Sequence, residues 1–236
     1  MTPMTDLAVG LIPARGGSKS IPKKNLVSFA GKPLIDYVIT AGQSSQRLTS
    51  LVCSTDDPEI ADHCHSKGVE VDWRDERLAQ DDSHIVDVVV DFLNRRKIPP
   101  SFLVLLQPTS PIISSQQIDQ AVSVLTVQHD CMSVQTVSDV PHNCHAFNQR
   151  EIRDGQIHFR FEPERKEMFN KQKKPPFFIF ANLVAARCSA IIEQNNMFPR
   201  PSSPIVVDRQ YAFDLDTAGD IEVGECLIAE RAKSNP

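Results

Sequence analysis

The sequence contains no apolar run of the roughly 20 residues that a membrane-spanning helix needs, and we therefore expect no membrane partner. Residues 1–6 lack the basic and apolar segments of a secretory leader. None of the six cysteines belongs to a Cys-x-x-Cys pair, so the expected state is separate, reduced thiols. Together these absences predict a cytoplasmic protein.

An excess of positive charge is also lacking. Basic residues number 25 and acidic residues 30, which leaves a formal net charge of -5. Proteins that bind nucleic acids usually carry a basic face, so this balance argues against a nucleic-acid partner. A small anionic ligand is still allowed, because a local basic loop can lie within an acidic protein. With 236 residues, 41% of them hydrophobic, the chain fits a single domain over residues 1–236.

One such basic loop follows the first apolar run, residues 7–12. The segment 13–25, PARGGSKSIPKKN, contains two glycines and the cationic residues Arg15, Lys19, Lys23 and Lys24. Glycines let the backbone approach an anion, and the cations can neutralise phosphate oxygens. The loop has neither the Gly-Lys-Ser/Thr ending of a Walker A motif nor the GxGxxG dinucleotide fingerprint. It therefore predicts a phosphate site of another kind.

Strand and helix patterns alternate through residues 7–137. Apolar runs predict strands at 7–12, 51–53, 69–71, 102–106 and 132–137. Helical spacing predicts helices at 33–44, 58–67, 83–96 and 118–127, the first with Pro33 in its opening turn. This alternation predicts an α/β fold, with a Rossmann-like, mostly parallel sheet and helices on both faces. The run at 102–106 is the most apolar and is expected at the centre of the sheet.

Ligands of such sheets bind beyond the carboxyl ends of the strands. Three loops then matter, namely the Arg15 loop, the Asp56 loop after 51–53 and the Gln107 loop after 102–106. We expect them to border one crevice, with the Gln107 amide pointing into it.

Residues 138–186 interrupt the pattern with a polar excursion. It contains a predicted hairpin turn at Asp154-Gly155, and apolar order returns in a strand predicted at 177–186. We interpret the excursion as a lid over the site or as an arm that contacts a second subunit. Beyond it we expect a helix at 189–194, a strand at 205–207 and a last helix at 218–231, with Thr217 as its N-cap.

Two carboxylates, Asp214 and Asp216, stand two residues apart near the C-terminus. Side chains two apart in an extended segment project to the same side, so both can face one site. Oxygen ligands of this kind suit Mg²⁺, which keeps several waters and bridges to substrate phosphates. The pair therefore predicts a magnesium site. His142 and His145 have no third ligand placed beside them, and we do not expect them to bind a metal.

The opening loop, Arg15-x-x-Ser18 followed by Lys24-Asn25, resembles the signature of CMP-sialic acid synthetases, which are related to CMP-KDO synthetases. Five further motifs follow in the order of that family: Gly31-Lys32-Pro33-Leu34-Ile35, Ser54-Thr55-Asp56, Leu78-Ala79-x-Asp81, Leu106-Gln107-Pro108-Thr109-Ser110-Pro111 and Asp214-Leu215-Asp216-Thr217. The resemblance covers nearly the whole chain. It implies a fold of the nucleotide-diphospho-sugar transferase type and a CTP-dependent nucleotidyltransferase that joins CMP to a nonulosonic acid, an α-keto sugar acid, with release of pyrophosphate.

The same resemblance implies a role for each matching residue. The catalytic residues would be Arg15, Lys24, Asp214 and Asp216. The CTP-binding residues would be Arg15, Ser18, Lys24, Asn25, Arg74 and Ser83. The sugar would contact Gln107, Asn182 and Lys171, and the cofactor Mg²⁺ would bind Asp214 and Asp216. Family members are typically dimeric, which implies a homodimer.

Departures from the family pattern leave the acceptor open. The glycine that normally follows the asparagine matched by Asn182 is Leu183 here. The family's sugar-binding arginine has no clear counterpart, so Lys171 or Lys173 would serve, with a point charge in place of a bidentate fork. The alternatives are a CMP-KDO synthetase-like activity, transfer to a sugar phosphate, and a nucleotide-binding protein that has lost catalysis.

Overall fold

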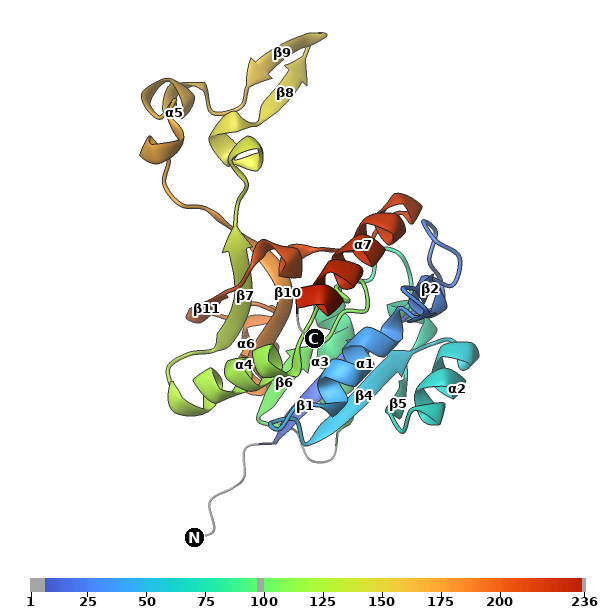
Figure 1. The fold of residues 1–236 in the computed structure, drawn as a ribbon. Coiled ribbons are helices and arrows are strands. Elements are labelled where there is room, and N and C mark those ends of the chain that lie inside the picture. The colour runs from blue at the N-terminus through green and yellow to red at the C-terminus, as the bar shows by residue number, and fades with distance from the viewer. Residues whose placement is uncertain (1–6, 97–99, 235–236) are drawn as a thin grey trace.

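A sheet runs through the middle of the molecule (Figure 1). The computed structural model describes residues 7–96 and 100–234, so the expectation about a leader at residues 1–6 lies outside them. Within the described residues the sheet has seven strands, in the spatial order β11 (Ser202–Val206), β7 (Ser133–Asp139), β10 (Phe178–Arg187), β6 (Phe102–Leu105), β1 (Ala8–Pro13), β4 (Ser50–Thr55) and β5 (Glu70–Trp73). β10 is antiparallel to both neighbours, and the other neighbouring pairs are parallel. The predicted mostly parallel α/β fold is confirmed.

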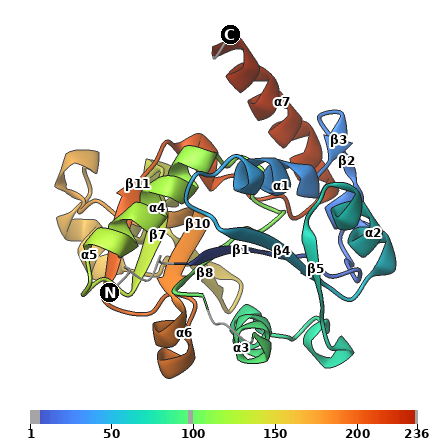
Figure 2. The same cartoon turned by 90° about the horizontal axis from the view of Figure 1, so that it is seen from below.

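Helices cover both faces of this sheet (Figure 2). One face carries α1 (Ile35–Gln43), α2 (Pro58–Ser66) and α4 (Ser115–Val127), and the other carries α3 (Ile85–Arg95) and α6 (Cys188–Gln194). Each face has its own buried apolar cluster. β6 serves both, because Phe102 and Val104 join the first cluster while Leu103 and Leu105 join the second. This explains its continuous apolar run, and β6 is the middle strand of the sheet, as predicted.

Pro33 and Thr217 stand at two of the predicted helix starts. The prediction that Pro33 opens a helix is wrong, because Pro33 pairs with Ser28 in a hairpin of β2 (Ser28–Phe29) and β3 (Lys32–Pro33), and α1 begins at Ile35. The last helix, α7 (Ala218–Ser234), does begin directly after Thr217. There the Asp220 carboxylate accepts hydrogen bonds from the Thr217 amide (2.7 Å) and hydroxyl (2.9 Å), so Asp220 supplies the capping contact.

The polar excursion forms an arm that extends away from the sheet (Figure 1). It holds a hairpin of β8 (Arg150–Arg153) and β9 (Gln156–Phe159), followed by α5 (Glu162–Glu167). The hairpin turn falls at Asp154 (φ 51°) and Gly155 (φ 75°), as predicted. At the base of the arm, the buried His145 ring stacks on Phe177 with centroids 4.5 Å apart. His145 therefore has a packing role there.

The helices beside the first strand are tied by a buried carboxylate. Asp36 of α1 contacts Nε2 of His63 at 2.6 Å and Nζ of Lys67 at 3.0 Å, both from the α2 region. Burial by itself raises the pKa of Asp36, but the contacts with His63 and Lys67 outweigh it and hold this pKa below its usual value. The cluster therefore stabilises the fold most when Asp36 is ionised. Among the described residues, no helix is both long and apolar enough to cross a membrane.

Candidate active site

A pocket of about 470 Å³ opens beyond the carboxyl ends of the parallel strands β1, β5 and β6. The sequence-predicted residues that line it are Arg15, Ser18, Lys24, Asn25, Arg74, Ser83, Gln107 and Asp216. A larger, mainly apolar cavity of about 820 Å³ lies at the base of the arm and is lined by none of these residues. The smaller pocket is therefore the candidate site, because it joins charged groups from segments far apart in the sequence.

The glycine loop after β1 is held in a defined shape. The Gly16 amide donates to Oδ1 of Asp56 (3.0 Å), and the Asn25 side-chain amide donates to the Arg15 carbonyl (2.8 Å). A Cβ atom on Gly16 would lie 2.4 Å from Oδ2 of Asp57, so the loop passes too close to Asp57 for any larger residue. Asn25, predicted as a CTP-binding residue, thus also holds the loop in shape.

The cations of this loop are paired with acids from other segments. Arg15 Nη2 lies 2.8 Å from Oδ1 of Asp81, and Lys19 contacts the other oxygen of the same carboxylate. Lys24 Nζ, with a side chain only 12% exposed, lies 3.2 Å from Oδ1 of Asp216. Both acids line the same pocket as the cations. The pocket therefore holds the cationic side chains that a polyphosphate needs, and each of them is paired with a carboxylate of the protein.

Arg74 reaches the pocket from the end of β5. Its guanidinium is mostly buried and donates to the Ser54 carbonyl at 2.8 Å. Burial lowers the pKa of Arg74, and the nearby Asp56 charge partly opposes this. Ser83 lies in the loop before α3, where its hydroxyl donates to the Arg77 carbonyl at 3.1 Å. Arg74 and Ser83 therefore face the pocket from one wall.

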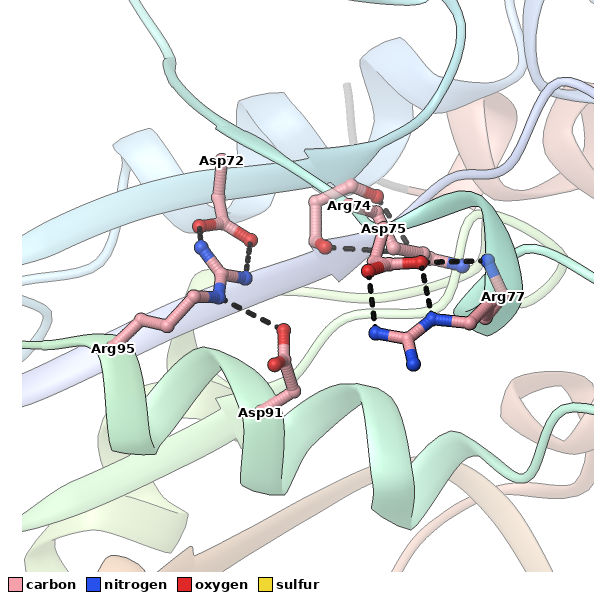
Figure 3. A network of polar contacts seen from close by, with 7 residues as sticks. Asp72, Arg74, Asp75, Arg77, Asp91 and Arg95 are labelled. Carbon is pink, nitrogen blue, oxygen red and sulfur yellow. Dashed lines mark hydrogen bonds and ion pairs between the residues drawn. The ribbon is translucent and has the colours of Figure 1, made fainter.

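That wall is fixed by a network that sequence reasoning missed (Figure 3). Arg95 of α3 makes two parallel contacts with the Asp72 carboxylate of β5, at 2.6 and 2.9 Å, and its Nε lies 2.9 Å from Asp91. The paired geometry ties α3 to β5, and α3 contributes Ile85 and Val88 to the pocket. Asp72 and Arg95 stand 23 residues apart and belong to no motif, so nothing in the sequence pairs them.

The two C-terminal carboxylates flank a buried leucine. Leu215 is fully buried, and its amide donates to the Thr109 carbonyl at 2.7 Å, which brings this segment beside the loop after β6. Asp214 lies 3.4 Å from the Ser110 hydroxyl, and Asp216 faces Lys24. The Asp214 side chain is open to solvent on one side, yet loss of hydration on the other raises its pKa, and the negative charge of Asp216 adds to this.

The donor set suits Mg²⁺. The negative charge of Asp216 helps to raise the pKa of Asp214, and a cation beside this pair would offset that repulsion, with the phosphates of a substrate supplying further oxygens. No cluster of three or more His, Cys, Asp or Glu side chains suited to a metal occurs in the part of the chain that the structure describes. A metal here would thus need oxygens from substrate and water. Whether Asp214 and Asp216 bind Mg²⁺ stays a prediction.

Asn182, predicted at the sugar site, is enclosed by the protein. It is 1% exposed, its amide donates to the Ile112 carbonyl (2.7 Å) and to Gln117 (3.2 Å), and its oxygen accepts from the Thr136 hydroxyl (2.8 Å). These contacts show Asn182 bracing the loop that follows Gln107, and its contact with the sugar stays a prediction.

Lys171 is also apart from the pocket. It lies in a short 3₁₀ helix of the arm, η5 (Lys171–Lys173), and lines a separate cavity of about 730 Å³ together with His142, Lys174 and Arg209. Within one chain the structure does not bring Lys171 to Gln107, which is half-buried at the end of β6 and lines the pocket. The predicted contact of Lys171 with the sugar is therefore not met inside a single subunit.

Beyond the carboxyl edge of this α/β sheet, a basic glycine loop faces the Asp216 carboxylate, an arrangement expected of an enzyme of the nucleotidyltransferase class. Residues 9–154 match the family model described as cytidylyltransferase. The CMP-N,N'-diacetyllegionaminic acid synthase of Legionella pneumophila is 31% identical over 231 residues, which cover 93% of this chain and 95% of that protein. The chain therefore belongs to the cytidylyltransferase family, and the resemblance found in the sequence is confirmed.

Two further comparisons agree with this. The pseudaminic acid cytidylyltransferase of Campylobacter jejuni (serotype O:2) is 27% identical over 222 residues, covering 92% of this chain and 94% of that protein. The solved structure of a CMP:2-keto-3-deoxy-manno-octonic acid synthetase complexed with CTP has a TM-score of 0.73 at 15% identity, and the match covers 95% of this chain and 99% of that chain. The latter likeness shows the shared fold alone.

Proposed function

We propose that the protein transfers CMP from CTP to the anomeric hydroxyl of a nonulosonic acid and releases pyrophosphate. The observation that carries this proposal is the pocket in which Arg15, Lys24, Gln107 and Asp216 meet. Family membership supports the nucleotide, and relatives named for legionaminic and pseudaminic acids support the acceptor. The likeness to the CMP:2-keto-3-deoxy-manno-octonic acid synthetase concerns the fold and gives no support for KDO as the acceptor.

The reaction asks the protein for positioning and charge compensation. The anomeric hydroxyl gives up its proton to solvent water, and its oxygen bonds to the α-phosphorus. The bond from that phosphorus to the bridging oxygen of the β-phosphate breaks, and pyrophosphate leaves with the electron pair. Arg15 and Lys24 are placed to hold the triphosphate and to neutralise the charge that builds on the leaving group. Gln107, across the pocket, is placed to orient the acceptor.

Mg²⁺ would be held by Asp214 and Asp216 and, when bound, would supply charge neutralisation at the phosphates. Lys24 Nζ pairs with Asp216 at 3.2 Å and can exchange this partner for a phosphate oxygen. Leu215, which lies between the two carboxylates, fixes this segment beside the loop after β6, because its amide donates to the Thr109 carbonyl.

An acceptor panel tests the proposal. Purified protein is incubated with CTP, Mg²⁺ and one of several acids, namely N-acetylneuraminate, legionaminate, pseudaminate or KDO, with a sugar phosphate as a further acceptor. Pyrophosphate release is measured. We expect the fastest release with a nonulosonic acid. Release with KDO or the sugar phosphate alone would reassign the acceptor, and no release with any acceptor, despite CTP binding, would indicate the inactive nucleotide-binding alternative.

Two variants test the residue roles. Asp216→Ala should lower kcat at least about 100-fold and leave CTP binding largely intact, because the carboxylate serves the reacting phosphates. Arg15→Ala should raise the apparent CTP constant and slow turnover. Lys23→Ala is the matched control, since Lys23 pairs with Glu59 at 2.6 Å and does not line the pocket. Unchanged turnover in Asp216→Ala would refute the metal assignment.

We further propose a homodimer, as the family resemblance implies. Phe178, Ile179 and Phe180 of β10 are 46%, 40% and 36% exposed at the base of the arm, where a second copy could bury them. Light scattering should give twice the chain mass, and Phe178→Ser should shift the protein toward monomer. A single-chain mass for the unchanged protein would refute the dimer. The cytoplasmic location stays a prediction, which cell fractionation can test.

A further inference from the structure

The Asp81 carboxylate lines the pocket together with the cations of the glycine loop. It contacts two cations of the glycine loop at once, Arg15 through one oxygen (2.8 Å) and Lys19 through the other. A second nitrogen of Arg15 donates to the carbonyl of Ala79 at 3.3 Å, in the same loop as Asp81. The loop 79–83 is thus held onto the glycine loop through groups that a triphosphate would also require.

The ion pairs of Asp81 with Arg15 and Lys19 hold the loops together, yet an incoming anion can replace the carboxylate. The contacts with Lys19 and then with Arg15 hold the pKa of Asp81 below its usual value, so the carboxylate stays ionised near neutral pH. The side chains remain accessible, with Asp81 44% and Arg15 33% exposed, so water screens the pairs and an incoming anion can reach them. A triphosphate, with several charges, competes well for such cations.

We propose that Asp81 is an internal substitute for a phosphate group, which keeps Arg15 and Lys19 in position in the free enzyme and gives them up when CTP binds. Release of Asp81 also frees the loop that carries Ser83, which links binding of the triphosphate to the placement of the pocket wall that contains Arg74 and Ser83. After the reaction, Asp81 re-forms its pairs and favours departure of pyrophosphate. This inference rests on the proposed function, since it assigns the pocket to a triphosphate.

The sign of the effect of Asp81→Asn decides the proposal. The variant keeps the shape of the side chain but removes the competing charge, so CTP should bind about two- to fivefold more tightly, the range expected for exposed ion pairs. If Asp81 instead contacted the nucleotide or its metal, the same substitution would weaken binding. Titration calorimetry with CTP measures the dissociation constant, and the gain should shrink at high salt because the pairs are accessible.

Asp82→Asn is the matched control. It removes the same charge from the adjacent position of the same loop, and Asp82 forms no ion pair with the residues that the structure describes. If the gain in affinity comes from the specific pairing, Asp81→Asn must exceed Asp82→Asn. Equal gains would mean that general electrostatics explain the effect, and they would overturn the proposal, as would an unchanged or weakened affinity in Asp81→Asn.

A second probe separates this inference from the proposed function. Inorganic tripolyphosphate carries the charges of the triphosphate without base or sugar, and Asp81→Asn should bind it more tightly than the unchanged protein does. If the unchanged protein binds tripolyphosphate but not CTP, the proposed function fails while the role of Asp81 is still decided by the comparison of variants. If CTP binds and supports pyrophosphate release but Asp81→Asn gains no affinity for either ligand, the inference alone fails.

Discussion

Replacement of Gly16 by alanine should damage both the phosphate loop and the helix beside it. A Cβ on Gly16 would lie 2.4 Å from Oδ2 and 2.8 Å from Cβ of Asp57, whereas ordinary contact begins near 3.4 Å, so the two segments must separate by about 1 Å. Asp57 cannot yield freely, because its Oδ1 accepts the amides of Glu59 (2.8 Å) and Ile60 (3.1 Å) at the start of α2.

The expected cost follows from these contacts. Loss or distortion of the α2 cap costs about 1 kcal/mol, which for a chain of this length lowers Tm by roughly 2–4 °C. The effect on catalysis is larger, because displacement of positioning groups by about 1 Å can reduce the rate about 100-fold. Gly16→Ala should therefore lower kcat/KM for CTP far more than it lowers stability. Urea unfolding and pyrophosphate release measure the two quantities.

The neighbouring glycine is the control. A Cβ on Gly17 would meet no atom within 4 Å, so Gly17→Ala should keep the free energy of unfolding within about 0.5 kcal/mol of the unchanged protein. Equal losses of stability in the two variants would show that any substitution in the glycine loop lowers the free energy of unfolding, and that the contact of Gly16 with Asp57 is not the cause. A Gly16→Ala protein with unchanged stability and unchanged kcat/KM would refute the reasoning outright.

Three further predictions concern polar residues outside the pocket. Because the pKa of Asp36 is lowered in the folded state, its stabilisation is complete above the unfolded carboxyl value near 4 and is lost as pH falls through the lower folded value. Urea unfolding of Asp36→Asn should thus show a flatter dependence on pH below about 4, and an unaltered profile would contradict this. Arg95→Lys keeps the charge but loses the two parallel contacts with Asp72, so it should cost about 1 kcal/mol in thermal unfolding and raise KM for CTP, whereas full stability would mean that the pair is dispensable. Asn182→Ala leaves the Ile112 carbonyl unpaired and should cost about 2 kcal/mol, and a raised acceptor KM without loss of stability would support a sugar contact.

Sequence patterns predicted structure correctly where the residues of a single strand or turn determine it. The apolar run that became β6 is buried on both faces, and its central position follows from that composition. The turn at Asp154 and Gly155 follows from residues that accept positive φ. Pro33 was misplaced because both a helix start and a short strand tolerate proline, and only the pairing with Ser28 separates them.

Residue types and motif order in the sequence determined the predicted class of chemistry. A basic glycine loop predicts phosphate binding, and two carboxylates spaced two residues apart predict metal binding, wherever the fold places them. The meeting of Lys24 with Asp216 and the ties from Arg95 to Asp72 and from Arg15 to Asp81 were decided only by the tertiary structure. Each joins segments whose distance depends on the order of strands in the sheet. Burial was likewise decided in three dimensions, because an asparagine reads the same in a sequence whether its amide faces a ligand or, like Asn182, is enclosed by the protein.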